Sequence, residues 1–176
     1  MDGPLTVRTA TLDDCDDLGV ITVAASFGSF IGRIPEADLD LTWSPPESAS
    51  AWTRTLTELP PDDLFDVADD GTRGVIGFVW AGPSTRRAGA FGEIKGLYVL
   101  PTQQRRGVGR RLISHVARQL QERSIASLLV GCVRENPSCG FYRRLGGVEA
   151  FREPSVVDRY QTEEIFFFWP DTRVLV

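Results

Sequence analysis

Two glycines set among arginines join a strand-like segment to a helix-like one, and this junction restricts the possible folds more than any other part of the sequence. The segment YVLPTQQRRGVGRR (residues 98–111) passes through Gly107 and Gly109 into a helix predicted over residues 107–123. Such a turn directs free backbone N–H groups and the positive end of a helix dipole at an anion. It lacks the Lys-Ser/Thr pair of a P-loop and the third glycine of a dinucleotide fingerprint. A glycine turn also serves purely structural purposes, so alone it leaves both interpretations open.

Strand-like and helix-like patterns alternate along the rest of the chain. In order, we expect a strand over 5–10, a helix over 11–27, a hairpin about Asp70-Gly71, a strand over 92–100, the helix over 107–123, a strand over 126–133, a short helix from Asn136-Pro137 to Gly146-Gly147, and strands over 148–153 and 159–170. This order predicts an α/β fold with a single mixed sheet, formed by one domain over residues 1–176.

Local signals refine three of these elements. Thr11 and Asp14 form a capping-box pattern at the start of the first helix. Asp70-Gly71 favours a two-residue type I′ turn, because glycine tolerates positive φ. Five prolines within residues 28–62 predict an irregular region of loops and short helix, and the polar segment 83–90 is expected to be a loop.

Charge and composition exclude several classes of function. The first 70 residues carry 15 acidic and 3 basic side chains, and the remainder carry 9 and 16. A nucleic-acid partner would require a dominant basic surface, so a small anionic ligand fits this balance better. The sequence has no apolar run of membrane-spanning length, and its first residues do not resemble a signal peptide, so we expect a cytoplasmic protein without membrane contact. Three cysteines and one histidine without metal-ligand spacing indicate structural thiols and no metal site.

Three ordered motifs resemble the GNAT N-acetyltransferase superfamily. The run Gln104-Arg105-Arg106-Gly107-Val108-Gly109 is similar to its coenzyme-binding signature, and Asn136 with Tyr142 is similar to its later Asn…Tyr helix. The first strand and helix and the last strand also match, so the resemblance covers essentially the whole chain. It implies a mostly antiparallel sheet whose central parallel strand pair splays apart, flanked by helices.

The resemblance also implies acetyl-coenzyme A as co-substrate. Its pyrophosphate would meet the backbone amides of Arg105, Arg106, Gly107, Val108, Gly109 and Arg110. Its pantetheine would pair with the backbone of Leu97, Tyr98 and Val99 and contact Asn136. Arg110 and the arginines that follow it on the helix also fit an ordinary solvated face.

Acetyl transfer to an amine requires removal of a proton from the amine and protonation of the leaving thiolate. The resemblance assigns the second role to Tyr142, which otherwise fits an ordinary core aromatic. Glu93, at the start of the strand that carries Leu97, is the candidate base, acting through water; an exposed carboxylate at a strand end is the alternative. The backbone N–H of Val99 is the simplest donor to the developing oxyanion.

Two features depart from familiar members of the superfamily. Relatives that acetylate ribosomal-protein N-termini often carry a glutamate where this chain has Gly131, which argues against a protein N-terminus as acceptor. The six-residue spacing from Asn136 to Tyr142 is one shorter than in some members.

The acceptor is the least determined part of the prediction. Aromatic and acidic residues could hold a cationic amine by cation–π and charge attraction, or could be core and surface residues. They are Phe27, Phe30, Trp43, Trp52 and the segment 153–161. The sequence therefore predicts an acetyltransferase for a small-molecule primary amine. The alternatives are a catalytically silent acyl-coenzyme A binding or sensing module and, least favoured, a nucleic-acid binder; a homodimer is possible.

Overall fold

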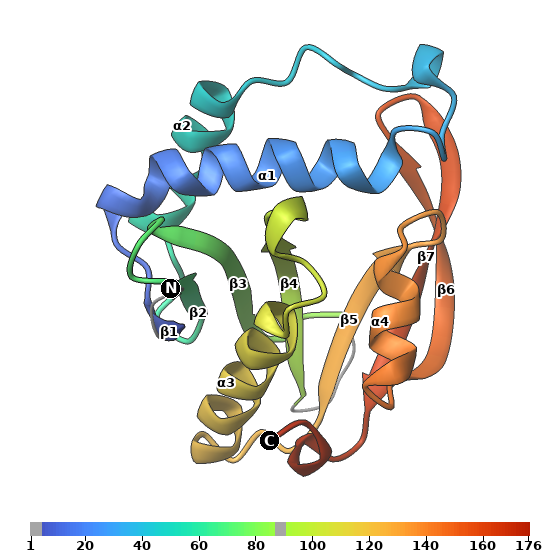
Figure 1. Cartoon of the computed structure of the whole chain (residues 1–176). Helices are drawn as coiled ribbons and strands as arrows, with labels where there is room; N and C mark the ends of the chain where they lie inside the picture. The colour runs from blue at the N-terminus through green and yellow to red at the C-terminus, as the bar shows by residue number, and fades with distance from the viewer. Residues whose placement is uncertain (1–4, 87–90) are drawn as a thin grey trace.

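One seven-stranded sheet organises the part of the chain that the computed structural model describes, residues 5–86 and 91–176 (Figure 1). Its order is β1-β2-β3-β4-β5-β7-β6. The strands are β1 (Thr6–Thr9), β2 (Leu64–Asp69), β3 (Val75–Pro83), β4 (Gly92–Val99), β5 (Leu128–Val133), β6 (Val148–Val157) and β7 (Tyr160–Trp169). Every neighbouring pair is antiparallel except β4–β5, which is parallel. The predicted mixed, mostly antiparallel sheet is confirmed.

Helices cover both faces of the sheet, and alternate residues of β2 show which helices lie on which side. Phe65 and Val67 pack in a cluster with residues of α1 and α2, whereas Leu64 and Ala68 belong to the cluster that contains α3 and α4. Successive side chains of a strand point to opposite faces, so the two helix pairs lie on opposite sides. The helices are α1 (Cys15–Phe30), α2 (Pro45–Thr57), α3 (Val108–Glu122) and α4 (Ser138–Arg144).

The region predicted to be irregular contains the 13-residue helix α2, so the expectation of only loops and a short helix was wrong. Pro45 occupies the first turn, where its missing N–H costs nothing, and Ser44 and Glu47 form a reciprocal capping box. The prolines thus begin this helix. Trp52 then anchors α2 on α1, donating an Nε1–H hydrogen bond of 2.8 Å to Thr22 Oγ1.

The hairpin at Asp70-Gly71 is confirmed, but its loop is longer than the predicted two-residue turn. Strand β3 resumes only at Val75. The Asp70 Oδ1 atom accepts backbone hydrogen bonds from Thr72 and Arg73, and Gly71 and Gly74 have φ of 71° and 81°. A side-chain-supported turn therefore replaces the tight one. The predicted polar loop over 83–90 falls partly outside the described residues, since 87–90 are not among them.

The capping box predicted at Thr11 is confirmed, and it carries an ion pair with the first strand. Asp14 accepts hydrogen bonds of 2.8 Å from both terminal nitrogens of Arg8 and one of 2.7 Å from the Thr11 N–H. The hydrogen bond from Arg8 is the main cause that lowers the pKa of Asp14 below its ordinary 3.8, against the opposing effect of burial. This interaction joins β1 to the start of α1.

We expect Asp14→Asn to lower the free energy of unfolding at pH 7 by roughly 1–2 kcal/mol, because Arg8 loses a buried anionic acceptor but is itself partly exposed. A folded-state pKa below the unfolded value stabilises the fold above that value, and this contribution disappears as the pH falls through the folded pKa. Urea unfolding of both proteins between pH 7 and pH 3 measures the difference. A difference that stays constant across this range would contradict the assignment.

Candidate active site

The parallel strands β4 and β5 separate soon after they meet. Their backbones pair only from Gly92–Leu128 to Ile94–Val130, although β4 continues to Val99 and β5 to Val133. Trp80 faces Gly96 and Ala81 faces Ile94, so Lys95 is the extra residue of a β-bulge on β4. A bulge bends and twists its strand, which turns the end of β4 away from β5. Figure 1 shows the resulting opening between the two strands.

The unpaired edge of β4 presents backbone groups to this opening. The Leu100 N–H donates to the Ile76 carbonyl near the start of β3, and the Gln104 side chain donates to the Val99 carbonyl at 3.1 Å. Backbone groups of successive residues in a strand point to opposite sides. The N–H groups of Val99 and Leu97 therefore point into the opening, while the Tyr98 backbone pairs with β3. Two of the three predicted pantetheine-pairing residues thus have the required direction.

The turn between β4 and α3 leaves the first amides of the helix without partners inside the helix. Gly107 is the N-cap of α3 with a φ of 86°, and Arg105 has a φ of 62°. The Arg111 N–H makes the first helical hydrogen bond, 3.0 Å to the Gly107 carbonyl. The preceding amides of Val108, Gly109 and Arg110 have no carbonyl within the helix to bond, so they are available to an anion.

The two glycines of the turn serve different purposes. A Cβ on Gly107 would meet no atom within 4 Å, so the space in front of the helix is open. A Cβ on Gly109 would lie 3.3 Å from the Phe141 ring, so this glycine lets α4 approach α3 closely. Among the arginines, Arg106 donates to Gln103 Oε1 at 2.8 Å and so braces the turn.

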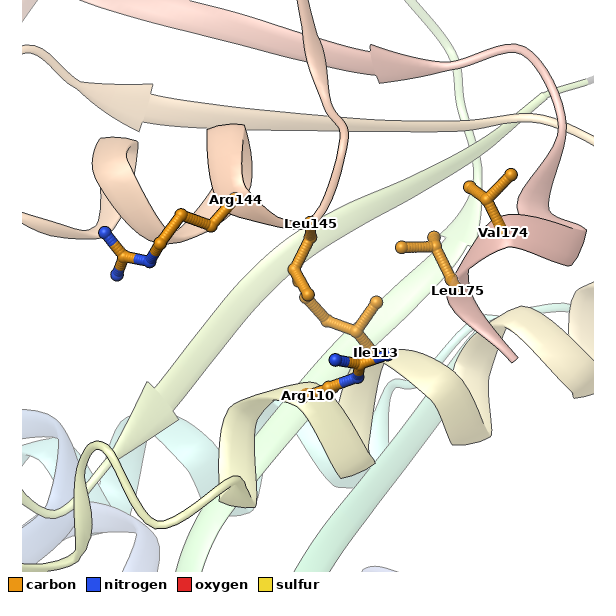
Figure 2. A pocket seen from close by; sticks show the side chains of 6 residues that line it. All are labelled: Arg110, Ile113, Arg144, Leu145, Val174 and Leu175. Carbon is orange, nitrogen blue, oxygen red and sulfur yellow. The ribbon is translucent and has the colours of Figure 1, made fainter.

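A small cavity of about 120 Å³ lies beside the first turn of α3, lined by residues of α3, the end of α4 and the C-terminal turn (Figure 2). Its lining residues are Arg110, Ile113, Arg144, Leu145, Val174 and Leu175. Figure 2 shows Ile113 and Leu145 facing each other across the hollow, with Leu175 beside them. The cavity thus combines apolar side chains with two arginines, and Arg110 belongs to the first turn of α3.

Tyr142 belongs to α4, and its side chain packs in the hydrophobic core on the α3 side of the sheet. It is 5% exposed, and its ring centroid is 5.7 Å from that of Phe167 and 6.3 Å from that of Trp169. Burial raises its pKa well above the ordinary value. No hydrogen-bond partner of its hydroxyl is found in residues 5–86 and 91–176, and no side-chain N or O atom there is both fully buried and unpaired. The hydroxyl oxygen therefore retains an accessible surface where a ligand could meet it.

Asn136 occupies the turn before α4. Its Oδ1 accepts the Ser138 N–H at 2.9 Å, so the side chain caps the short helix as the Asn-Pro pair predicted. This hydrogen bond uses only Oδ1 and does not involve the side-chain amide nitrogen of Asn136.

Glu93 is not exposed, so the alternative of a solvated strand-end carboxylate is wrong. It is 9% exposed and accepts hydrogen bonds of 2.7 Å from Ser84 Oγ and from Arg86 Nε, one on each oxygen. Gly131 and Glu164 lie on the same face of the sheet as Glu93, opposite Tyr142. The structure thus places the two predicted catalytic residues on opposite faces of the opening.

The aromatic residues predicted for the acceptor side divide into two groups. Trp52 is a packing residue, with its ring 5.1 Å from Phe78 and 5.5 Å from Phe65. Trp43, by contrast, is 52% exposed in the loop before α2. This loop is tied to the β6–β7 hairpin, because the Arg159 guanidinium donates to the Ala37 and Leu39 carbonyls. The expected acceptor segment 153–161 therefore lies next to the α1–α2 connection.

Other candidate chemistries find no support among the described residues. All three cysteines are free and buried, and no group of three His, Cys, Asp or Glu side chains in that part of the chain is arranged to hold a metal ion. None of the helices formed by these residues combines the length and apolar character of a membrane span.

Comparison with known proteins agrees with this geometry. The family model described as acetyltransferase (GNAT) family matches residues 33–147. The chain belongs to the GNAT family of acetyltransferases. The N-acetyltransferase YuaI of Bacillus subtilis, itself uncharacterized, is 28% identical over 173 residues, covering 97% of this chain and 96% of that protein.

Solved structures show the same fold. A GNAT-family protein from Desulfovibrio desulfuricans has a TM-score of 0.72 and 14% identity, covering 96% of this chain and 99% of that one. The PaiA N-acetyltransferase of Thermoplasma acidophilum, solved with coenzyme A, has a TM-score of 0.67 and 16% identity, covering 94% and 98%. The predicted family and fold are confirmed. As a GNAT N-acetyltransferase, this protein uses acetyl-coenzyme A, and the open edge of β4 and the free amides of α3 fit that molecule.

Sequence reasoning missed Glu164 on β7. A Cβ on Gly131 would lie 2.2 Å from Glu164 Oε1, so the glutamate side chain occupies the space that the glycine leaves. The available signal was the alternation of β7, in which Glu164, Phe166 and Phe168 share one face. That pattern does not reveal which neighbouring strand the carboxylate overlies.

We expect Gly107→Ala to raise the Kd for coenzyme A about tenfold or more, because a Cβ there strains the turn and enters the space before the free amides. Gly71→Ala is the matched control, since Gly71 also has positive φ and an open Cβ position but lies in the β2–β3 loop. Isothermal titration calorimetry of the three proteins measures the effect. Equal losses of affinity in both variants would contradict a role for the turn in binding.

Proposed function

We propose that this protein transfers an acetyl group from acetyl-coenzyme A directly to a primary amine of a small molecule. The observation that carries the proposal is the opening between β4 and β5, which has the buried phenol of Tyr142 on one face and carboxylates on the other. A donor bound along β4 from the α3–α4 side would meet an acceptor arriving from the opposite face. Two reactants held in this way gain the proximity that direct transfer requires.

In this proposal Val99 and Tyr142 act on the donor side. Acetyl-coenzyme A supplies an activated thioester carbonyl. The Val99 N–H, directed into the opening, donates a hydrogen bond to the carbonyl oxygen as negative charge develops on it. The Tyr142 hydroxyl gives its proton to the departing sulfur. The phenol is protonated at neutral pH, as a general acid must be, although burial raises its pKa and makes proton transfer to the thiolate more uphill.

Glu93 is proposed to receive the acceptor's proton through water. A primary amine with an ordinary pKa near 10.4 is almost fully protonated at neutral pH, so it must lose a proton before it can attack. Both oxygens of Glu93 already accept hydrogen bonds, from Ser84 and Arg86. A bridging water is therefore the natural route from the amine to this carboxylate.

The same hydrogen bonds favour one alternative, a catalytically silent acyl-coenzyme A binding or sensing module. If Ser84 and Arg86 keep Glu93 from accepting a proton and no other group replaces it, binding would occur without transfer. The cytoplasmic location and the homodimer expected from the sequence stay predictions alongside this choice.

Free-thiol release from acetyl-coenzyme A across a panel of amines decides between these functions. The panel contains aminoglycosides, polyamines, amino acids and their analogues, and lysine or N-terminal peptides. We expect release above the hydrolysis blank with one class of small amine. Release with peptides alone would contradict the small-molecule acceptor, and silence in a protein that coenzyme A still stabilises against heat would favour the binding module.

We expect Tyr142→Phe to lower kcat by roughly 10²–10⁴-fold while leaving the Kd for coenzyme A unchanged, because it removes only the proton donor. Thr6→Val, on the edge strand β1, removes an exposed hydroxyl far from the opening and should leave kcat unchanged. Steady-state kinetics with the acceptor found in the panel measures both. Full activity of Tyr142→Phe would remove this residue from the mechanism.

A further inference from the structure

The Glu164 carboxylate stands over a glycine of the neighbouring strand. Glu164 pairs with Val133 of β5 and Glu153 of β6, and its side chain leans along β5 toward Gly131. Any other residue at position 131 would bring a Cβ to 2.2 Å from Glu164 Oε1. The Glu164 carboxylate can therefore occupy this space only because residue 131 is a glycine.

This place lies at the point where β4 and β5 separate. The last paired residues are Ile94 and Val130, so Gly131 is the first residue of β5 beyond the pairing. Ile165 and Phe167 pack in the core cluster that contains Tyr142, so Glu164, which directly precedes Ile165 on the same strand, points to the opposite face. A reacting carbon in the opening would thus have the phenol on one side and this carboxylate on the other.

Glu164 is half-buried without a hydrogen-bond donor among residues 5–86 and 91–176. The cation with the largest effect on the pKa of Glu164 is Arg86. Its guanidinium hydrogen-bonds other carboxylates, with Nε donating to Glu93 at 2.7 Å and Nη1 to Glu153 at 3.0 Å. The guanidinium also lies 4.5 Å from the centre of the Phe166 ring. Glu164 is therefore the carboxylate at this site that still has both oxygens available to a ligand.

The surroundings of Glu164 raise its affinity for a proton. Burial is the main cause that raises its pKa above the ordinary 4.5, and Glu153 of β6 and Glu93 of β4 add to it. Arg86, from the β3–β4 connection, opposes the shift. A carboxylate destabilised in its charged form gains from an incoming cation and accepts a proton more readily than an exposed one.

We propose that Glu164 binds the ammonium group of the acceptor and takes its proton before the amine attacks. This role rests on the acetyl transfer proposed above and places Glu164 in direct contact with the acceptor, with Glu93 behind it. One N–H bond of the ammonium breaks, the proton passes to a Glu164 oxygen, and the freed nitrogen lone pair forms the new bond to the acetyl carbon. The C–S bond then breaks, the sulfur takes the proton of Tyr142, and the nitrogen gives its second proton through water to the Tyr142 oxygen. The protonated carboxyl then passes its proton through water to Glu93 and on to solvent, which restores the site and keeps Glu93 in the role proposed above.

The first test compares Glu164→Gln with wild type and with Glu163→Gln, using the acceptor found in the amine panel. Glu163 is the matched control, since it neighbours Glu164 but lies on the other face, 3.5 Å from Arg134 and 3.6 Å from Arg152. We expect Glu164→Gln to lower kcat/KM at pH 7 by roughly 100-fold or more and to weaken binding of the amine in calorimetry. The Kd for coenzyme A should not change, and Glu163→Gln should resemble wild type.

The pH dependence separates a base from a structural residue. We expect the wild-type acid limb of kcat/KM to follow the raised pKa of Glu164, and the Glu164→Gln activity to rise instead toward the amine's own pKa near 10.4. Because the folded pKa is raised, the charged carboxylate costs stability above that pKa, so Glu164→Gln should be at least as heat-stable as wild type at pH 7. Its advantage should vanish as the pH falls below 4.5.

The outcomes distinguish this inference from the proposed function. An active wild type with an unchanged rate and pH profile in Glu164→Gln would overturn the role of Glu164 and leave the acetyl transfer standing. A similar loss confined to Glu93→Gln would assign direct proton transfer to Glu93 instead. Silence of the wild type across the whole panel would overturn both. Gly131→Ala gives independent support, since its Cβ would displace the carboxylate and should lower kcat/KM without removing any charge.

Discussion

The short pairing of β4 with β5 is the constraint on which the rest of this structure depends. When two central strands of a sheet stop pairing with each other, the sheet is held together only by their other neighbours. Here β4 and β5 each stay paired with the strand on their other side. β4 remains paired with β3 along its length, and β5 with β7 from Leu128 to Val133. The bulge at Lys95 turns β4 away and exposes its backbone edge. The opening is thus built into the sheet and needs no separate cavity.

Helices α3 and α4 cover one face of the sheet at the opening, and the charges on this face differ from those on the other. They pack together where Gly109 lets Phe141 approach, and both contribute to the large core cluster on one side of the sheet. The amides at the start of α3 and the arginines around them make this side suited to phosphate. On the opposite side, the carboxylates of Glu93, Glu153 and Glu164 interact with the guanidinium of Arg86. An anionic donor and a cationic acceptor therefore have different faces from which to approach.

The errors of sequence interpretation arose where tertiary contacts decide the outcome. The Ser-Pro-Pro-Glu run at Ser44 contained a complete helix start, but the prolines were weighed as helix breakers when their position in the first turn made them compatible with a helix. Asp70 predicted a turn correctly, yet its carboxylate supports a longer loop. Glu93 was placed on the right strand, but its burial and its bond to Arg86 depend on a residue that reaches it only in the folded chain.

The sequence by itself determined the order of the elements, the glycine turn at Gly107 and the positions of Asn136 and Tyr142, because each depends on local backbone preference or on short-range spacing. Only the tertiary structure decided how far β4 and β5 pair, on which faces Tyr142 and the carboxylates lie, and that Glu164 fills the space over Gly131. These features arise from the register between strands far apart in the chain. One strand's pattern of alternation specifies a face of the sheet, but not the neighbour that lies beside it.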